Sequence, residues 1–166
     1  MLHFDDIVFG PIFSRRLGSS LGVNLLPSKG KLCNFDCIYC ECGWNRDGAQ
    51  DRTFPSFEDV RSALEHKISS ASAEGVPVDS ITFSGNGEPT MHPDFPAVID
   101  LVLALRDRYY PQAKVSVLSN GTLVGRPEIA EALMRVDNPI LKIDASSDEL
   151  IQKINKPVGR YRLEEV

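Results

Sequence analysis

Hydrophobic positions along the chain follow two alternating patterns, which predict strands that are each followed by a helix. Short apolar runs bounded by Gly, Pro or polar residues are typical of buried strands, and they occupy residues 21–26, 78–83, 114–118 and 139–144. Apolar residues spaced three and four positions apart come after each run and predict helices that begin near Ser56, Pro93, Pro127 and Ser147. We expect Ser56 and Ser147 to be N-caps, and Asp59, three residues after Ser56, to complete a capping box. Before residue 21 we expect irregular structure with one short strand over residues 7–9.

This order of elements predicts an α/β fold. Strands that alternate with helices pair in parallel through right-handed crossovers. We therefore expect one domain over residues 1–166, built as an incomplete TIM-like parallel βα barrel of about four βα units. The loops rich in Gly, Asn and Cys all follow predicted strands. Because parallel α/β folds carry their active sites at the carboxyl ends of the strands, we expect the polar chemistry at that end.

Composition and charge change this picture little. The chain has 166 residues and a net charge of -5, which is unlike the basic balance of most nucleic-acid-binding surfaces. Arg15, Arg16, Lys29 and Lys31 make one region locally basic, and we interpret it as a solvated face. No apolar run reaches the ~18 residues of a membrane span. The amino terminus lacks the basic and then apolar pattern of a signal peptide, so we expect a cytoplasmic protein.

All four cysteines lie between positions 33 and 42. Such a cluster in a chain without an export signal indicates a metal site rather than disulfides. Cys33, Cys37 and Cys40 have the spacing Cys-x3-Cys-x2-Cys, typical of the short loops that hold iron–sulfur clusters. Zinc is the alternative, since Cys42 brings the thiolates to the four that structural zinc sites use. A zinc ribbon, however, has two Cys-x2-Cys pairs, and this chain has one.

With Tyr39 before its last cysteine, the stretch from Cys33 to Cys40 resembles the signature of the radical S-adenosylmethionine (SAM) enzymes. The resemblance implies a [4Fe-4S] cluster ligated by Cys33, Cys37 and Cys40, with SAM bound to the remaining iron. Reductive cleavage of SAM would then give methionine and a 5′-deoxyadenosyl radical, which takes hydrogen from a substrate. The resemblance also implies an electron donor such as flavodoxin or ferredoxin, and it leaves Cys42 without a role.

Three further segments resemble SAM-binding elements of that family. The resemblance implies that the glycine-rich turn holds the SAM amino group, through Gly85, Asn86, Gly87 and Glu88. Asn86, which stands between the two glycines, departs from the family pattern. By the same resemblance the SAM carboxylate or ribose is bound by Ser119 and Asn120, and SAM or substrate by Lys142 and Asp144. Tyr39 would lie near the adenine.

Each of these segments also has a plainer interpretation from its residues alone. Gly85 and Gly87 suit a simple turn, and Asn120 before a glycine suits a hydrogen-bonded Asn-Gly turn. Lys142 and Asp144 lie two residues apart in the fourth predicted strand, so they share one face. A mutual salt bridge would offset their burial in an interior strand.

A closer resemblance within the family is to radical SAM proteins related to wyosine-tRNA synthesis. It rests on residues 10–24, 40–41 and 84–90, and it implies tRNA as a candidate substrate. As a substrate partner we expect an RNA or a protein. The family barrel has six βα units, whereas this sequence predicts about four, so we expect the last units of the family barrel to be lacking. We expect an exposed sheet edge through which two copies could pair. The alternative function is a non-catalytic iron–sulfur or zinc module, or an inactive fragment of such an enzyme.

Overall fold

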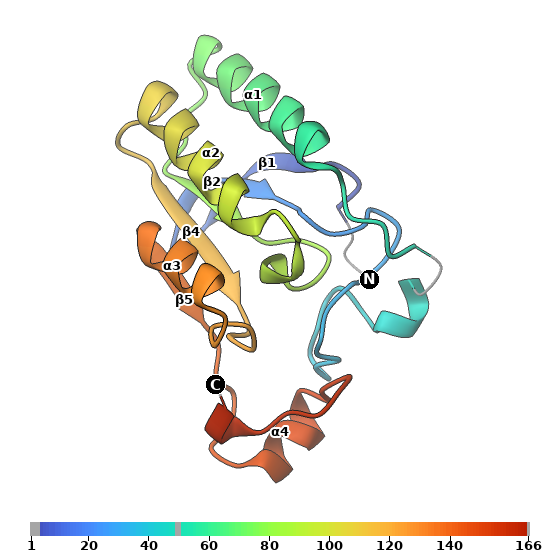
Figure 1. The fold of residues 1–166 in the computed structure, drawn as a ribbon. Helices are drawn as coiled ribbons and strands as arrows, with labels where there is room; N and C mark the ends of the chain where they lie inside the picture. The colour runs from blue at the N-terminus through green and yellow to red at the C-terminus, as the bar shows by residue number, and fades with distance from the viewer. Residues whose placement is uncertain (1–3, 49–50, 166) are drawn as a thin grey trace.

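A five-stranded sheet forms the centre of the computed structural model, which describes residues 4–48 and 51–165 (Figure 1). Its order is β1-β2-β3-β4-β5. The strands are β1 Val8–Ser14, β2 Gly18–Val23, β3 Ser80–Phe83, β4 Lys114–Ser119 and β5 Asn138–Leu141. β1 is antiparallel to β2, and the other neighbours pair in parallel. The predicted α/β class, with a mostly parallel sheet that forms part of a barrel, is confirmed.

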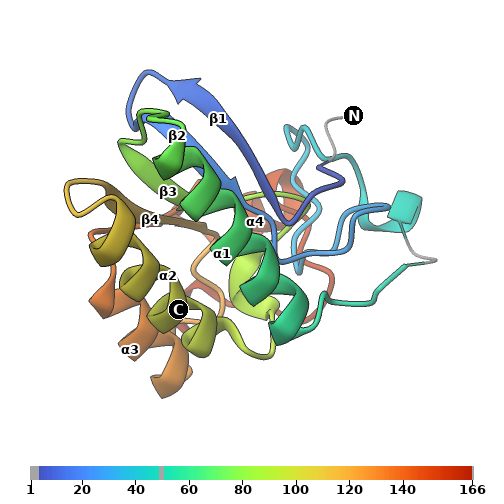
Figure 2. The ribbon, with the colours of Figure 1, turned by 90° about the horizontal axis from the view of Figure 1, so that it is seen from above.

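Three helices cover one face of the sheet (Figures 1 and 2). They are α1 Phe57–Ala73, α2 Phe95–Tyr109 and α3 Pro127–Arg135. Ser56 begins α1 with the predicted capping box, since its hydroxyl and the carboxylate of Asp59 each accept a backbone hydrogen bond from the other residue. Alternate strand residues such as Leu21 and Ile81 are fully buried in the core that these helices complete.

The opposite face of the sheet carries small hydroxyl side chains. The hydroxyls of Ser20 and Thr82 lie 2.7 Å apart, and those of Ser80 and Ser116 lie 3.0 Å apart. These buried hydroxyls therefore satisfy one another's hydrogen-bonding capacity. Toward the carboxyl ends of the strands, the same face opens into a cavity.

The two edges of the sheet differ from the sequence expectation. β1 is a full strand where we expected mostly irregular structure, because the ladder tolerates Pro11 at a register shift between Phe9 and Ile12. β5 ends at Leu141 and lies at the edge of the described sheet. Lys142 and Asp144 therefore follow an edge strand instead of lying within an interior one.

The last helix, α4 Asp148–Ile154, lies apart from the other helices and beside the segment that carries the cysteines (Figure 1). Ser147 caps it as predicted. A second, small apolar cluster there joins Ile151 to Phe35 and Cys37. Backbone bonds add to this contact, since the Ile38 N–H donates to the Ile154 carbonyl at 2.9 Å. The carboxyl-terminal part of the described chain thus holds the cysteine segment in place.

The remaining short helices are η1 Asn45–Gly48, η2 Pro89–Met91 and η3 Leu163–Glu165. Within residues 4–48 and 51–165, none of the helices has the length and apolar character needed to cross a membrane.

Candidate functional site

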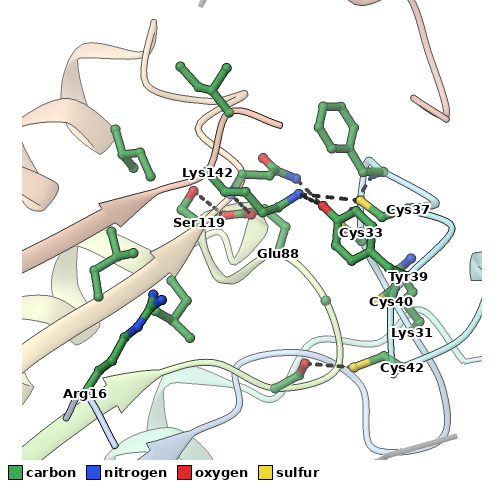
Figure 3. A pocket seen from close by; sticks show the side chains of 18 residues that line it. Arg16, Lys31, Cys33, Cys37, Tyr39, Cys40, Cys42, Glu88, Ser119 and Lys142 are labelled. Carbon is green, nitrogen blue, oxygen red and sulfur yellow. Dashed lines mark hydrogen bonds between the residues drawn. The ribbon is translucent and has the colours of Figure 1, made fainter. Parts of the chain in front are cut away.

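A cavity of about 540 Å³ lies at the carboxyl ends of β3, β4 and β5, and we call it the cysteine cavity (Figure 3). Its walls are formed by Arg16, Lys31, Cys33, Phe35, Cys37, Tyr39, Cys40, Cys42, Gly85, Gly87, Glu88, Leu118, Ser119, Asn120, Ile140, Leu141, Lys142 and Ile143. The structure therefore brings together most of the residues singled out in the sequence. Two of them, Asn86 and Asp144, are not among the lining residues.

The cysteine loop, residues 31–45, is shaped by buried polar side chains. The Asn45 Oδ1 atom accepts a hydrogen bond from the Cys33 N–H at 2.9 Å. Lys31 is only 3% exposed, and its Nζ atom lies 3.2 Å from both Asp36 Oδ1 and the Gly43 carbonyl. The interpretation of Lys31 as part of a solvated face was wrong, because its side chain turns inward to hold this loop.

The acidity of the thiols differs within the loop. A hydrogen bond from Cys42, assisted by the Lys31 charge, lowers the pKa of Cys40 to about 5 despite burial. Burial raises the pKa of Cys33 to about 12, although the Phe35 N–H donates to its sulfur. Burial acts to lower the pKa of Lys31, but the charges of Cys40 and Cys33 outweigh it and raise that pKa overall. A buried cation beside the thiols favours the thiolate form, which is the form that binds metals.

Hydrogen-bond donors point at two of the sulfurs. The Cys37 Sγ atom lies 3.6 Å from Lys142 Nζ and 3.3 Å from Asn155 Nδ2. The Cys33 Sγ atom lies 3.7 Å from Asn120 Nδ2. Donors directed at sulfur stabilise a negatively charged ligand sulfur in the same way that they stabilise any anion.

The three cysteines of the motif line one cavity, and thiolates are ligands of both iron–sulfur clusters and zinc. Within residues 4–48 and 51–165, no group of three or more Cys, His, Asp or Glu side chains is close enough to hold one metal ion. Structural zinc requires four ligands on one ion. A four-iron cluster bonds each thiolate to a different iron, so its ligands surround a larger object. Cys33, Cys37 and Cys40 all line the cysteine cavity, so their thiolates face the space that a bound group would occupy.

Glu88 connects the loops that follow β3 and β4. Its Oε1 atom accepts hydrogen bonds from Thr90 and from the Ser119 hydroxyl, the latter at 2.8 Å. Its Oε2 atom accepts one from the Asn120 N–H at 2.8 Å. A carboxylate has about four lone-pair sites. One acceptor position on Oε2 therefore remains for a ligand in the cavity.

The glycine-rich turn is shaped by the chain itself. Gly87 has φ +150°, and a methyl group there would overlap the carbonyl oxygen of Leu32, to which the Glu88 N–H donates at 3.2 Å. A methyl group on Gly85 would similarly overlap the Asn24 side chain. These glycines allow close approach of the turn to the segment before the cysteines.

Asn86 is fully buried, and its side chain forms hydrogen bonds with the backbone of other segments. Its Nδ2 atom donates to the Phe4 carbonyl at 2.8 Å and to the Pro27 carbonyl at 2.9 Å. Its Oδ1 atom accepts from the Phe4 N–H at 2.9 Å. The structure thus gives this side chain a role in holding loops together, and a direct cofactor contact by it stays a prediction from the resemblance alone.

Lys142 and Asp144 form the mutual salt bridge that the plainer interpretation anticipated, at 2.7 Å. The Lys142 Nζ atom also donates to the Tyr39 hydroxyl at 2.6 Å (Figure 3), and that hydroxyl contacts Asp144. Burial and the hydrogen bond to Asp144 raise the pKa of Tyr39 to about 12. Burial tends to raise the pKa of Asp144, but hydrogen bonds from Lys142, Tyr39 and Asn155 lower it overall.

Sequence reasoning missed several residues of this site. Asn155 is fully buried beside Cys37, but it lies far from the cysteines in sequence and had no motif to indicate it. Arg16 reaches the cavity wall from the β1–β2 hairpin, which the sequence did not predict. An apolar part of the wall consists of partly exposed Leu118, Ile140 and Ile143. Only Leu118 had a sequence signal, because it alternates with the buried residues Val117 and Ser119 of β4, whereas β5 has no buried residue.

The chain is similar to several curated proteins. A UPF0026 protein of Helicobacter pylori is 34% identical over 154 residues, which are 93% of this chain and 47% of that protein. A UPF0026 protein of Methanocaldococcus jannaschii is 32% identical over 152 residues, which are 91% of this chain and 44% of that protein. The chain thus spans about half the length of these curated relatives.

A more distant relative is named an S-adenosylmethionine-dependent nucleotide dehydratase. This protein of Selenomonas ruminantium is 29% identical over 115 residues, which are 68% of this chain and 36% of that protein. None of the relatives named here bears on the predicted similarity to wyosine-related proteins, which stays a prediction. The sequence pattern of the Radical SAM superfamily matches residues 28–166, which include the whole cysteine loop. The chain therefore belongs to the Radical SAM superfamily.

Proposed function

We propose that the cysteine cavity binds a [4Fe-4S] cluster through Cys33, Cys37 and Cys40 and binds SAM beside it. The observation that carries this proposal is that the three thiols share one cavity with the strand-end loops of β3, β4 and β5. The chemistry supplied by such a group is one-electron cleavage of SAM to methionine and a 5′-deoxyadenosyl radical, which takes hydrogen from a substrate. The electron is supplied by a partner such as flavodoxin or ferredoxin.

The chain's own residues hold and orient SAM. The free acceptor position of Glu88 Oε2 receives the SAM ammonium group, since a carboxylate pairs well with a cation. Asn120 and Ser119, at the end of β4, lie next to this carboxylate and bind the SAM carboxylate or ribose. Lys142, which also lines the cavity, supplies a positive charge 3.6 Å from the Cys37 sulfur. Tyr39, about half exposed at the cavity wall, lies against the adenine.

The substrate binds against the apolar wall of Leu118, Ile140 and Ile143, which exposes carbon atoms to the cavity. A nucleotide is a candidate, because the Selenomonas ruminantium relative is named for one. RNA and protein remain candidates from the sequence resemblance. The outer edge of β5 is the surface through which two copies would pair.

Anaerobic reconstitution of the chain with iron and sulfide tests the proposal. We expect about four irons and four sulfides per chain, as a [4Fe-4S] cluster requires. Reduction with dithionite in the presence of SAM should then release 5′-deoxyadenosine and methionine in equal amounts. A colourless chain that binds zinc, or a cluster-loaded chain that releases no 5′-deoxyadenosine, would contradict it and favour a non-catalytic module.

A further inference from the structure

We propose that Asn155 and Lys142 raise the reduction potential of the cluster by donating hydrogen bonds to the sulfur of Cys37. The inference rests on the proposed function, because it requires a cluster ligated by Cys37. It gives a role to Asn155, which lies outside the cysteine loop, the glycine-rich turn and the loops at the strand ends. This residue acts on the redox centre through the sulfur of Cys37.

Asn155 is held with its donor group directed at the site. The side chain is fully buried, and Nδ2 lies 3.3 Å from both Cys37 Sγ and the Tyr39 hydroxyl. The same nitrogen contacts Asp144 Oδ2. The Asn155 Oδ1 atom is buried and has no hydrogen-bond partner within the described residues. A buried amide oxygen without a partner destabilises a fold. Among the described residues, all polar contacts of this side chain are made by its Nδ2 atom.

The backbone fixes the position of this amide relative to the cysteine loop. Asn155 is the C-cap of α4, and its own N–H donates to the Ile151 carbonyl. The Asn155 carbonyl accepts from the Asp36 N–H at 2.8 Å, next to Cys37 in the chain. Ile151 also packs against Cys37 in the small apolar cluster. Because the amide and the thiol are held by the same contacts, the donor does not have to be reoriented when a cluster binds.

Lys142 approaches Cys37 as a second donor. Its Nζ atom lies 3.6 Å from Cys37 Sγ (Figure 3), and Asp144 and Tyr39 hold it there at 2.7 and 2.6 Å. Cys33 receives one side-chain donor, from Asn120, at the longer distance of 3.7 Å. Cys37 thus has two side-chain donors where Cys33 has one.

These donors stabilise the reduced state more than the oxidised state. When the cluster takes up one electron, the cluster and its thiolates together become one charge more negative. Hydrogen bonds and positive charge at the ligand sulfur then become more favourable, which raises the potential. Removal of either donor should therefore make the cluster harder to reduce.

A redox titration of the reconstituted chain tests this. Dithionite supplies the electrons through soluble mediators, and the reduced cluster is measured by electron paramagnetic resonance. The variants are Asn155→Leu and Lys142→Met, which keep the approximate shape and remove the donor. The control is Asn45→Leu, because Asn45 is a buried asparagine that fixes the loop through Cys33 N–H, Phe35 and Asp36 without any contact to a sulfur.

We expect the midpoint potential to shift to more negative values in both donor variants. The shift should be larger for Lys142→Met, which leaves the Asp144 charge unpaired. The control should lose iron but keep the wild-type potential in the cluster that remains. If Asn155→Leu holds no cluster, the shift of Lys142→Met decides.

Unchanged potentials in the cluster-loaded variants would overturn the inference, and so would an equal shift in Asn45→Leu. Either result would leave the proposed function intact. A wild-type chain that assembles no cluster would instead contradict the proposed function itself.

Discussion

The Oε2 atom of Glu88 accepts a hydrogen bond from the backbone N–H of Asn120 at 2.8 Å. This bond joins the loop after β3 to the loop after β4, and the Oε1 contact with the Ser119 hydroxyl reinforces it. Glu88 is only 2% exposed, so most of its hydrogen-bonding capacity serves the fold. One carboxylate thereby fixes two neighbouring strand ends before any ligand binds.

The substitution Glu88→Gln tests whether this carboxylate both joins the two loops and binds SAM. A glutamine cannot accept all these bonds, because one of its two terminal atoms is a donor, and we expect a loss of stability of about 1–3 kcal/mol. SAM should also bind the reconstituted variant more weakly, since the negative charge is gone. Urea unfolding and SAM calorimetry measure the two effects. Glu131→Gln, at an exposed position of α3, is the control and should change stability by less than about 0.5 kcal/mol. Wild-type stability of Glu88→Gln would contradict the assignment.

Single cysteine substitutions test the ligand set. We expect Cys33→Ala, Cys37→Ala and Cys40→Ala each to abolish stable cluster binding, whereas Cys42→Ala should retain it. The three-cysteine spacing excludes Cys42, whose thiol lies 3.3 Å from the Gly85 carbonyl. Iron content per chain after anaerobic reconstitution measures the effect. Equal iron loss from Cys42→Ala would indicate ligation by four cysteines.

The pKa values of the thiols predict a pH-dependent order of alkylation in the cluster-free chain. Cys40, with a pKa of about 5, should react first with iodoacetamide, and its rate should rise as pH increases through that value. Cys33, whose pKa of about 12 keeps it protonated near neutral pH, should react slowly. The sign follows because the thiolate is the nucleophile and forms above the pKa. Mass spectrometry of peptides labelled across a pH series measures both. Reaction of Cys33 ahead of Cys40 at pH 7 would contradict it.

Alanine substitutions at two glycines, Gly87 and Gly159, test the close approach of the glycine-rich turn to the cysteine loop. Gly87→Ala adds a methyl group that overlaps the Leu32 carbonyl at a residue with φ +150°. We expect destabilisation of about 2 kcal/mol or more, through backbone strain and displacement of the turn. Gly159→Ala is the matched control, because nothing lies within 4 Å of the added carbon. Urea unfolding of the two variants compares them, and equal stabilities would show that the turn is not constrained as described.

Local signals in the sequence predicted the elements well. Ser56 and Ser147 cap α1 and α4 as expected, since capping depends on residues within one turn. The parallel order of β2 to β5 follows from the alternation of strands and helices. β1 was not predicted in full, because Pro11 is tolerated only where the edge ladder shifts register.

Long-range contacts account for what the sequence did not reveal at the site. Lys31 was expected at a solvated face, but Asp36 and the Gly43 carbonyl bind its ammonium group in the interior. Asn155 lies 118 residues from Cys37 in the chain, and only the packing of α4 brings the two together. Glu88 was singled out because its own short segment, residues 84–88, resembles an element of the family, and that resemblance can be seen without knowing any long-range contact.

Calorimetric titration of SAM into the cluster-free and the reconstituted chain tests the central claim most directly, because that claim is that cluster and SAM share the cysteine cavity. We expect SAM to bind the reconstituted chain at least about tenfold more tightly, which corresponds to about 1.4 kcal/mol, since chelation by the open iron is available only there. Cys37→Ala after the same reconstitution should behave like the cluster-free chain. Equal and tight binding of SAM to both forms would contradict the assignment of an open iron in this cavity.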